Sequence, residues 1–234
     1  MGAVCLCIAI FVGSAVFQYP QKINNNVYWI AILNGLLLIV TTYLLFKATK
    51  ISDLSVSIPM LSATPLFLIF TSYLMVNELP TFYGLVGIFL IVIGAYAMHV
   101  KDYKMGFFYP FKELFKNKGS LYVLVVAFLF SIAANLGKIG ILNSSPIFYS
   151  FVVYLFVSIV MIPLITVDFN KKIEEIKSNL EYLALLGISS GFMMVVSAYA
   201  MLIAIVPYVI TLKRSSAIFA IFFGYFYFNE RSIR

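Results

Sequence analysis

The chain is a series of long apolar runs separated by short polar breaks. Most of the runs approach the length of about 20 residues that a helix needs to cross the hydrocarbon core of a bilayer, and the first is shorter. Strands of a membrane barrel would alternate in hydrophobicity over about ten residues, and these runs do not. The pattern therefore predicts eight membrane-spanning helices. They are expected at residues 2–17, 27–46, 54–76, 80–100, 120–142, 146–167, 182–205 and 207–228.

The polar breaks are of two kinds. Links such as "NELP" (77–80) are so short that the two helices they join must run antiparallel. Two connectors, 101–119 and 168–181, are longer and contain several lysines each. The breaks therefore predict helical hairpins, with two larger loops outside the membrane.

The two halves of the sequence resemble each other. A shift of 152 residues places Glu78 on Glu230, and it lays "IFTSYLMVNE" (69–78) over "IFFGYFYFNE" (221–230) without a gap. Apolar segments often match by chance, but the recurring Asn-Glu pair is more specific, and a duplication explains it. Between the two glutamates the predicted chain crosses the membrane five times. Because that number is odd, equivalent positions lie on opposite sides, and the two repeats are predicted to be inverted.

The basic residues support this topology and give its orientation. Twelve Lys or Arg residues fall on the side that holds the two long connectors, the 47–53 link and the C-terminus. The opposite side carries only Lys22. Since cytoplasmic loops are enriched in Lys and Arg, the first side is predicted to face the cytoplasm.

Composition also indicates an integral membrane protein. Hydrophobic residues make up 63% of the chain and charged residues 11%, against roughly 45–50% and about 25% in soluble proteins. A net charge of +7 would suggest nucleic acid as the partner of a soluble protein, but here the lysines lie between apolar runs and suit membrane anchoring. The expected partner is therefore the lipid bilayer and not nucleic acid. The expected location is the cell membrane, crossed several times.

Two sets of motifs carry a resemblance to a known family. In the first half Pro65 lies in a span, Glu78 follows thirteen residues later, and Gly87 and Gly94 lie seven apart in the next span. The second half contains "KRSSAIFAIFFGYFYFNE" (213–230) at the corresponding place. These segments resemble the EamA repeat of the drug/metabolite transporter superfamily.

The resemblance implies ten transmembrane helices, arranged as two inverted five-helix repeats around a substrate cavity near the middle of the membrane. The eight spans of this sequence look like helices two to nine of that pattern, so the first and last helices are expected to be missing. The resemblance then assigns residues 1–100 to the first repeat, 101–119 to a basic cytoplasmic connector and 120–234 to the second repeat.

Three basic residues lie inside predicted spans: Lys138, Lys213 and Arg214. A charge at the bilayer centre costs at least about 2.5–3.5 kcal/mol on insertion scales, so it should face a cavity or a partner. Lys138 lies near a span end, where its long side chain could instead reach the interface. In the first repeat Leu61 and Ser62 occupy the places of Lys213 and Arg214. The fold itself therefore does not require the two charges, and at least one of them is predicted to be the counter-charge of an anionic solute. A lipid phosphate or a helix-end carbonyl is the alternative partner.

Polar residues on neighbouring spans could complete such a site, and Asn135, Thr42 and Tyr199 are included with the three basic residues as predicted solute contacts. The alternative is that they hold membrane helices together. A second set is predicted to be structural, with Glu78 and Glu230 as helix caps and glycines that allow close helix packing. The predicted structural residues are Pro65, Glu78, Gly87, Gly94 and Glu230.

These observations favour a secondary transporter that moves a small metabolite, anionic or amino-acid-like, by alternating access. The alternative is a non-transporting fragment or a degenerate membrane paralogue with a structural or partner role, which the missing outer helices favour. No catalytic motif is found, and Cys5 and Cys7 suit packing better than metal binding, so no enzyme activity, metal or cofactor is expected. Self-association into a homodimer is left open.

Overall fold

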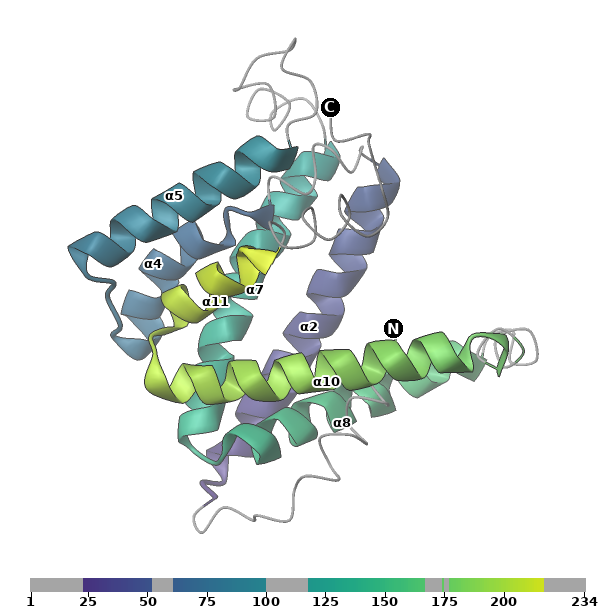
Figure 1. Cartoon of the computed structure of the whole chain (residues 1–234). Helices are drawn as coiled ribbons and strands as arrows, with labels where there is room; N and C mark the ends of the chain where they lie inside the picture. Colours follow the sequence, from purple (N-terminus) through teal and green to yellow (C-terminus); the bar gives the residue numbers. More distant parts are fainter. Residues whose placement is uncertain (1–22, 52–60, 100–117, 167–173, 175–176, 217–234) are drawn as a thin grey trace. The chain divides into compact units, whose positions relative to one another are not determined.

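The computed structural model describes residues 23–51, 61–99, 118–166, 174 and 177–216, and all of its regular elements in these ranges are α-helices (Figure 1). The predicted all-helical membrane bundle is confirmed, and the helices fall on the predicted spans. The first predicted span, residues 54–60, residues 217–228 and Glu230 lie outside the described ranges. The helices are α2 (Asn26–Ile51), α4 (Thr64–Val76), α5 (Phe82–His99), α7 (Lys118–Leu142), α8 (Pro146–Thr166), α10 (Leu180–Ile203) and α11 (Val206–Arg214).

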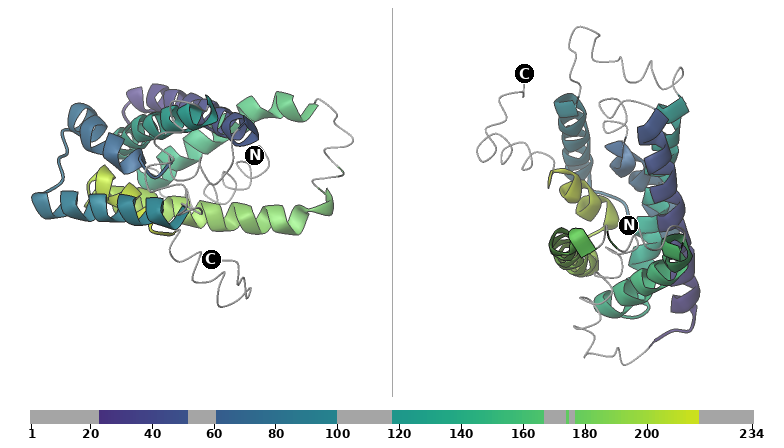
Figure 2. Two further views of the ribbon diagram at one scale, coloured as in Figure 1. Left: turned by 90° about the horizontal axis from the view of Figure 1, so that it is seen from above. Right: turned by 90° about the vertical axis from the view of Figure 1, so that its right-hand side faces the viewer.

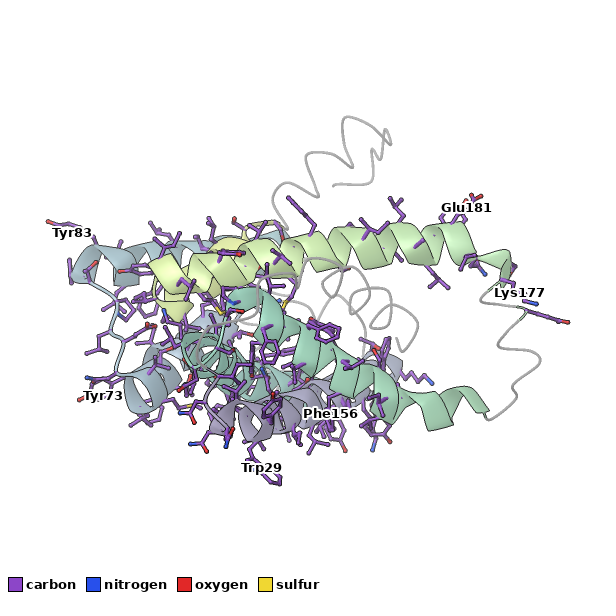
Figure 3. The ribbon with its side chains drawn as sticks, turned by 90° about the horizontal axis from the view of Figure 1, so that it is seen from below. Trp29, Tyr73, Tyr83, Phe156, Lys177 and Glu181 are labelled. Atoms are coloured by element: carbon purple, nitrogen blue, oxygen red, sulfur yellow. The ribbon has the colours of Figure 1, made fainter. Side chains whose placement is uncertain are left out.

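Large apolar side chains on the helix surfaces suit a lipid environment. Three described helices are long and apolar enough to cross a membrane: α2, α10 and residues 119–142 of α7. Trp29 and Tyr83 stand out from their helices (Figure 3) and are 74% and 85% exposed. Both lie in the first turns of their helices, where an amphipathic ring can reach the headgroup region.

Proline and asparagine set several helix ends. Pro65 and Pro207 lie in the first turns of α4 and α11, where the missing N–H of proline has no intrahelical partner in any case. At the end of α4, Asn77 adopts the left-handed conformation with φ 57°, and its N–H donates to the Ser72 carbonyl. Asparagine tolerates this conformation better than most residues. The Asn-Glu pair that marked the duplication therefore begins with a helix stop.

The chain forms two compact units. The first unit contains residues 1–39 and 136–203, and the second contains 40–135 and 204–234. Neither unit coincides with a predicted repeat, because α2 and α7 are each divided between the two units. The predicted repeat boundaries remain predictions.

In the first unit a buried tyrosine joins three helices. The Tyr149 hydroxyl of α8 accepts a hydrogen bond of 2.9 Å from the Asn34 amide of α2 and donates one of 3.3 Å to the Leu136 carbonyl of α7. A Cβ on Gly140 would lie 2.0 Å from the Tyr149 ring. Only glycine leaves room there, so the ring fixes the approach of α8 to α7.

In the second unit α11 packs against α4 and α5, and α4 packs against α5 (Figures 1 and 2). The buried residues of α4 recur with helical spacing at Thr64, Leu68 and Thr71. They form one face of the helix. Arg214 and Asn135 both form hydrogen bonds with this face, at Thr64 and Thr71.

Candidate functional site

The candidate site centres on Arg214, the last residue of α11. Its Nη2 donates a hydrogen bond of 3.3 Å to the Thr64 hydroxyl, at the start of α4. Thr64 is buried, and its own hydroxyl donates to the Leu61 carbonyl at 2.7 Å. The direction of the Thr64 hydroxyl is thereby fixed, with its oxygen left to accept from the guanidinium.

The remaining guanidinium edge has unused donor capacity. The Nε atom of Arg214 is buried, and it has no hydrogen-bond partner among the described residues. A guanidinium carries five N–H donors in a rigid plane, and the Nε and Nη groups along one edge match the two oxygens of a carboxylate or phosphate. A buried donor without a partner is unfavourable by about 1–3 kcal/mol. The site is therefore chemically suited to an anion.

Lys213 precedes Arg214 and is half-buried. Adjacent helix residues point about 100° apart, so the two side chains leave α11 in different directions. Arg214 turns toward α4. The two cations therefore sit at the same end of α11 and point in different directions.

The start of α11 is held by the turn between α4 and α5. Glu78 Oε2 accepts a hydrogen bond of 2.9 Å from the Val206 backbone N–H. Ile205, the residue before the helix, supplies no side-chain cap. Since the first N–H groups of a helix lack intrahelical acceptors and carry partial positive charge, a carboxylate is well placed there.

Tyr208 makes a second contact between α11 and the same turn. Its hydroxyl accepts from the Thr81 N–H at 3.0 Å and lies 3.1 Å from the Thr81 hydroxyl. A Cβ on Gly84 of α5 would lie 2.0 Å from this oxygen. Glycine at position 84 therefore makes space for Tyr208 against α5.

Lys138 lies in the first unit and has a different environment. The side chain is only 5% exposed, and its ammonium group donates to the Met201 carbonyl near the end of α10. The last carbonyls of a helix lack intrahelical donors, and this end attracts a positive charge. The structure thus gives the buried Lys138 side chain a partner within the protein.

Asn135 is fully buried in the second unit, and its amide is used by the protein. Its oxygen accepts from the Ser72 hydroxyl at 2.8 Å, and its nitrogen donates to the Thr71 hydroxyl at 3.0 Å and the Ser131 carbonyl at 2.9 Å. These bonds tie α7 to α4. The same contacts leave little of the amide available to a solute.

The other predicted residues are scattered. Thr42 is half-buried on α2, in the second unit, and takes part in an interaction within the structure. Tyr199 of the first unit is 44% exposed on α10. Among the predicted solute contacts of the second unit, Lys213 and Arg214 both lie on α11. Asn135 and Arg214 bond to the same face of α4, at Thr71 and Thr64, which are seven residues apart.

The glycines of α5 have different surroundings. In the described part of the chain, a Cβ on Gly87 or Gly94 would have no atom within 4 Å. These residues leave α5 open on that face, so no close approach of a described helix requires them. Gly84, for which close helix packing was also expected, is the α5 glycine at a tight contact, with Tyr208 of α11.

Several site residues were not predicted from the sequence. Thr64 and Tyr208 are ordinary polar residues in apolar runs. Nothing in their local pattern indicates that Thr64 meets Arg214, 150 positions away, or that Tyr208 meets Thr81, 127 positions away. Glu78 was predicted to be a helix cap, but α11 was not predicted to be the helix it caps, although one signal for this pairing was available. Pro207 marks the start of a helix, the preceding Ile205 cannot cap it, and a cap had to come from elsewhere.

Comparison with known proteins identifies one family. The model of the EamA-like transporter family matches residues 1–99 and 117–232. The unmatched residues 100–116 fall at the predicted basic connector. No curated protein matches the sequence. Within the described residues, no group of three or more His, Cys, Asp or Glu side chains could hold a metal ion.

Proposed function

Because this chain belongs to the EamA-like transporter family, we propose that it is a secondary transporter that moves a small carboxylate-bearing solute by alternating access. The family is one of transporters of the drug/metabolite type rather than of enzymes. Membership supports a multi-pass protein in a lipid bilayer with a small solute as its partner. The solute class and the mechanism are the proposal.

The observation that carries the solute class is the buried Nε donor of Arg214. The guanidinium lies in a segment predicted to be within the membrane, where an isolated charge is unfavourable. Thr64 is neutral and occupies one Nη2 bond. A carboxylate on the Nε edge would supply both the missing acceptor and the missing negative charge.

Lys213 is the second cation of the proposed site. An anion beside Arg214 would also feel the charge of its neighbour, since Coulomb attraction acts over several ångströms in a region of low dielectric. Lys138 is excluded from the proposed site because it is engaged at the end of α10. The proposed solute contacts are therefore Arg214 and Lys213, with Thr64 as the residue that orients the guanidinium.

Purified protein in detergent would be heated with L-amino acids, short-chain mono- and dicarboxylates, and inorganic phosphate. The proposal expects at least one carboxylate to raise the melting temperature, because a ligand that binds only the folded state stabilises it. The amide of that same compound is the matched control and should give no shift. Stabilisation by the amide and carboxylate alike would contradict recognition by the guanidinium.

Transport itself requires proteoliposomes. Radiolabelled uptake of the stabilising carboxylate should saturate, and it should be weakened in Arg214→Gln. A protein that binds the carboxylate but never moves it across the bilayer would support the alternative of a non-transporting paralogue.

The orientation belongs to the same proposal. The connectors after Lys47, Lys101 and Asp168 are proposed to face the cytoplasm of the cell, because the Lys and Arg residues are concentrated on that side. A cysteine at position 112 should resist a membrane-impermeant thiol reagent in intact cells and react in inside-out vesicles. Labelling from outside would reverse the orientation. The homodimer also remains a prediction.

A further inference from the structure

The short helix α11 is attached to the α4–α5 hairpin at both of its ends. Glu78 and Tyr208 join its start to the turn after α4. Arg214 joins its end to Thr64 at the start of α4. The two helices therefore run antiparallel and are held at both ends, and each has a buried apolar residue near its middle, Leu68 in α4 and Val209 in α11.

The cap at the start of α11 depends on Glu78. Val206 is fully buried, so its N–H has no access to water. Pro207 has no N–H, and the N–H groups of Tyr208 and Val209 both reach the Ile205 carbonyl, at 3.1 and 3.3 Å. Glu78 is thus the side chain that accepts from the first N–H of the helix. Without it, a buried donor at the positive helix end would lose its carboxylate.

We infer that Glu78 is a positioning residue for Arg214, because it fixes the start of the helix whose last residue carries the guanidinium. A helix of nine residues is too short to be stable by itself, and its direction is set by the contacts at its ends. The Thr64 bond alone fixes only one end. Glu78 and Tyr208 fix the other, about 12 Å away at the rise of a regular helix.

The inference connects the two halves of the sequence. Glu78 belongs to the first predicted repeat, and α11 belongs to the second. The side chain of Glu78 therefore serves another helix, while the backbone N–H groups of Asn77 and Glu78 both donate to the Ser72 carbonyl at the end of α4. The two residues of the pair have different tasks. Asn77 ends α4, and Glu78 caps α11, whose first residue lies 128 positions away.

This inference rests on the proposed function, which makes Arg214 a solute contact, but its test does not depend on transport. The chain has three arginines, Arg214, Arg231 and Arg234, so a ¹⁵Nε-arginine NMR spectrum of the purified protein is simple. Arg214→Gln assigns the Arg214 signal by its loss. Amide hydrogen exchange at Val206, measured on the same samples, reports the cap directly.

The variants are Glu78→Ala, Glu78→Gln and Tyr208→Phe, with Glu181→Ala as the matched control. Glu181 is an exposed carboxylate in the first turn of α10 (Figure 3). We expect Glu78→Ala to speed exchange at Val206 by about tenfold or more, because a charge-assisted hydrogen bond is lost. It should also shift or broaden the Arg214 Nε signal. Glu78→Gln retains an acceptor oxygen and should show a smaller change in both, and it serves if Glu78→Ala does not fold.

Tyr208→Phe removes only the hydroxyl that meets Thr81, so it should move the Arg214 signal less than Glu78→Ala. Glu181→Ala should change neither measurement. Faster exchange at Val206 with an unmoved Arg214 signal would overturn the inference, because Glu78 would then be a cap and nothing more. Unchanged exchange at Val206 would overturn it as well, since the cap would not hold the helix.

The proposed function fails by a different result. Acetate, succinate and the L-amino acids, with phosphate as a separate arm, would be added to the wild-type protein. If none of them moves the Arg214 Nε signal, the anion site is wrong. The effect of Glu78→Ala on the same signal would still test, independently, whether Glu78 positions Arg214.

Discussion

Lys138 and Arg214 are both cations on apolar helices, yet the protein treats them differently. Lys138 is buried in the first unit, and its ammonium group donates to the end of α10. Arg214 is in the second unit, where one Nη group meets Thr64 and the buried Nε has no acceptor among the described residues. The comparison shows that a charge inside a membrane helix is not by itself a sign of a binding site. What separates the two residues is the buried Nε of Arg214, which has no hydrogen-bond partner among the described residues.

The largest expected effect is on solute uptake. Arg214→Gln removes the charge and the bidentate edge, and it should weaken the apparent affinity for the transported carboxylate by about 10- to 100-fold, since hydrogen bonds to charged groups contribute about 1.5–3 kcal/mol. Lys138→Gln, the matched variant, should leave the affinity within about twofold, because its partner is a backbone carbonyl. Radiolabelled uptake in proteoliposomes measures both. Equal losses in the two variants would remove the distinction between them.

Arg214→Lys sharpens the same comparison by retaining the charge. A lysine ammonium is a point charge without the planar fork of arginine. We expect the affinity to fall by about tenfold, a loss of roughly 1.4 kcal/mol, when the bidentate contact is lost and the charge stays. The measurement is again the KM of uptake. If Arg214→Lys transports like the wild type, the site needs a positive charge and not a guanidinium, and the Nε atom loses its assigned role.

The sequence alone could predict the class of both residues but not this difference. Apolar runs, the duplication and the lysine distribution were sufficient for the helices, because each is a local or periodic property of the chain. The partners of Lys138 and Arg214 are Met201 and Thr64, which lie 63 and 150 positions away. No local pattern encodes such contacts. For the same reason Asn135 was grouped with the solute contacts, although Thr71 and Ser72 occupy its amide.

The free energy of unfolding should depend more on Lys138 than on Arg214, which is the reverse of the order expected for solute uptake. Lys138→Gln weakens the cap of α10, and a cation at a helix C-terminus contributes about 0.3–2 kcal/mol. We expect the free energy of unfolding to fall by about 1 kcal/mol for this variant. Arg214→Gln should leave it almost unchanged, because removing a buried charge without a full set of partners also relieves its desolvation. Denaturation in mixed micelles of both variants, followed by circular dichroism, tests this order, and a larger loss in Arg214→Gln would contradict it.

The smallest expected effect belongs to Thr64, whose hydroxyl accepts a hydrogen bond from the Arg214 guanidinium. Thr64→Val keeps the shape of the side chain and removes the hydroxyl, so it deletes the bond to Nη2 together with the bond to the Leu61 carbonyl. A neutral hydrogen bond contributes about 0.5–1.5 kcal/mol, which corresponds to a change in KM of roughly two- to tenfold. We expect the lower part of this range, since the 3.3 Å contact is long. Thr64→Ser keeps the hydroxyl and should restore the wild-type KM, which separates loss of the bond from a change in packing. A KM that rises equally in Thr64→Val and Thr64→Ser would assign the effect to packing around position 64 and not to the hydroxyl, and Thr64 would no longer be the residue that orients Arg214.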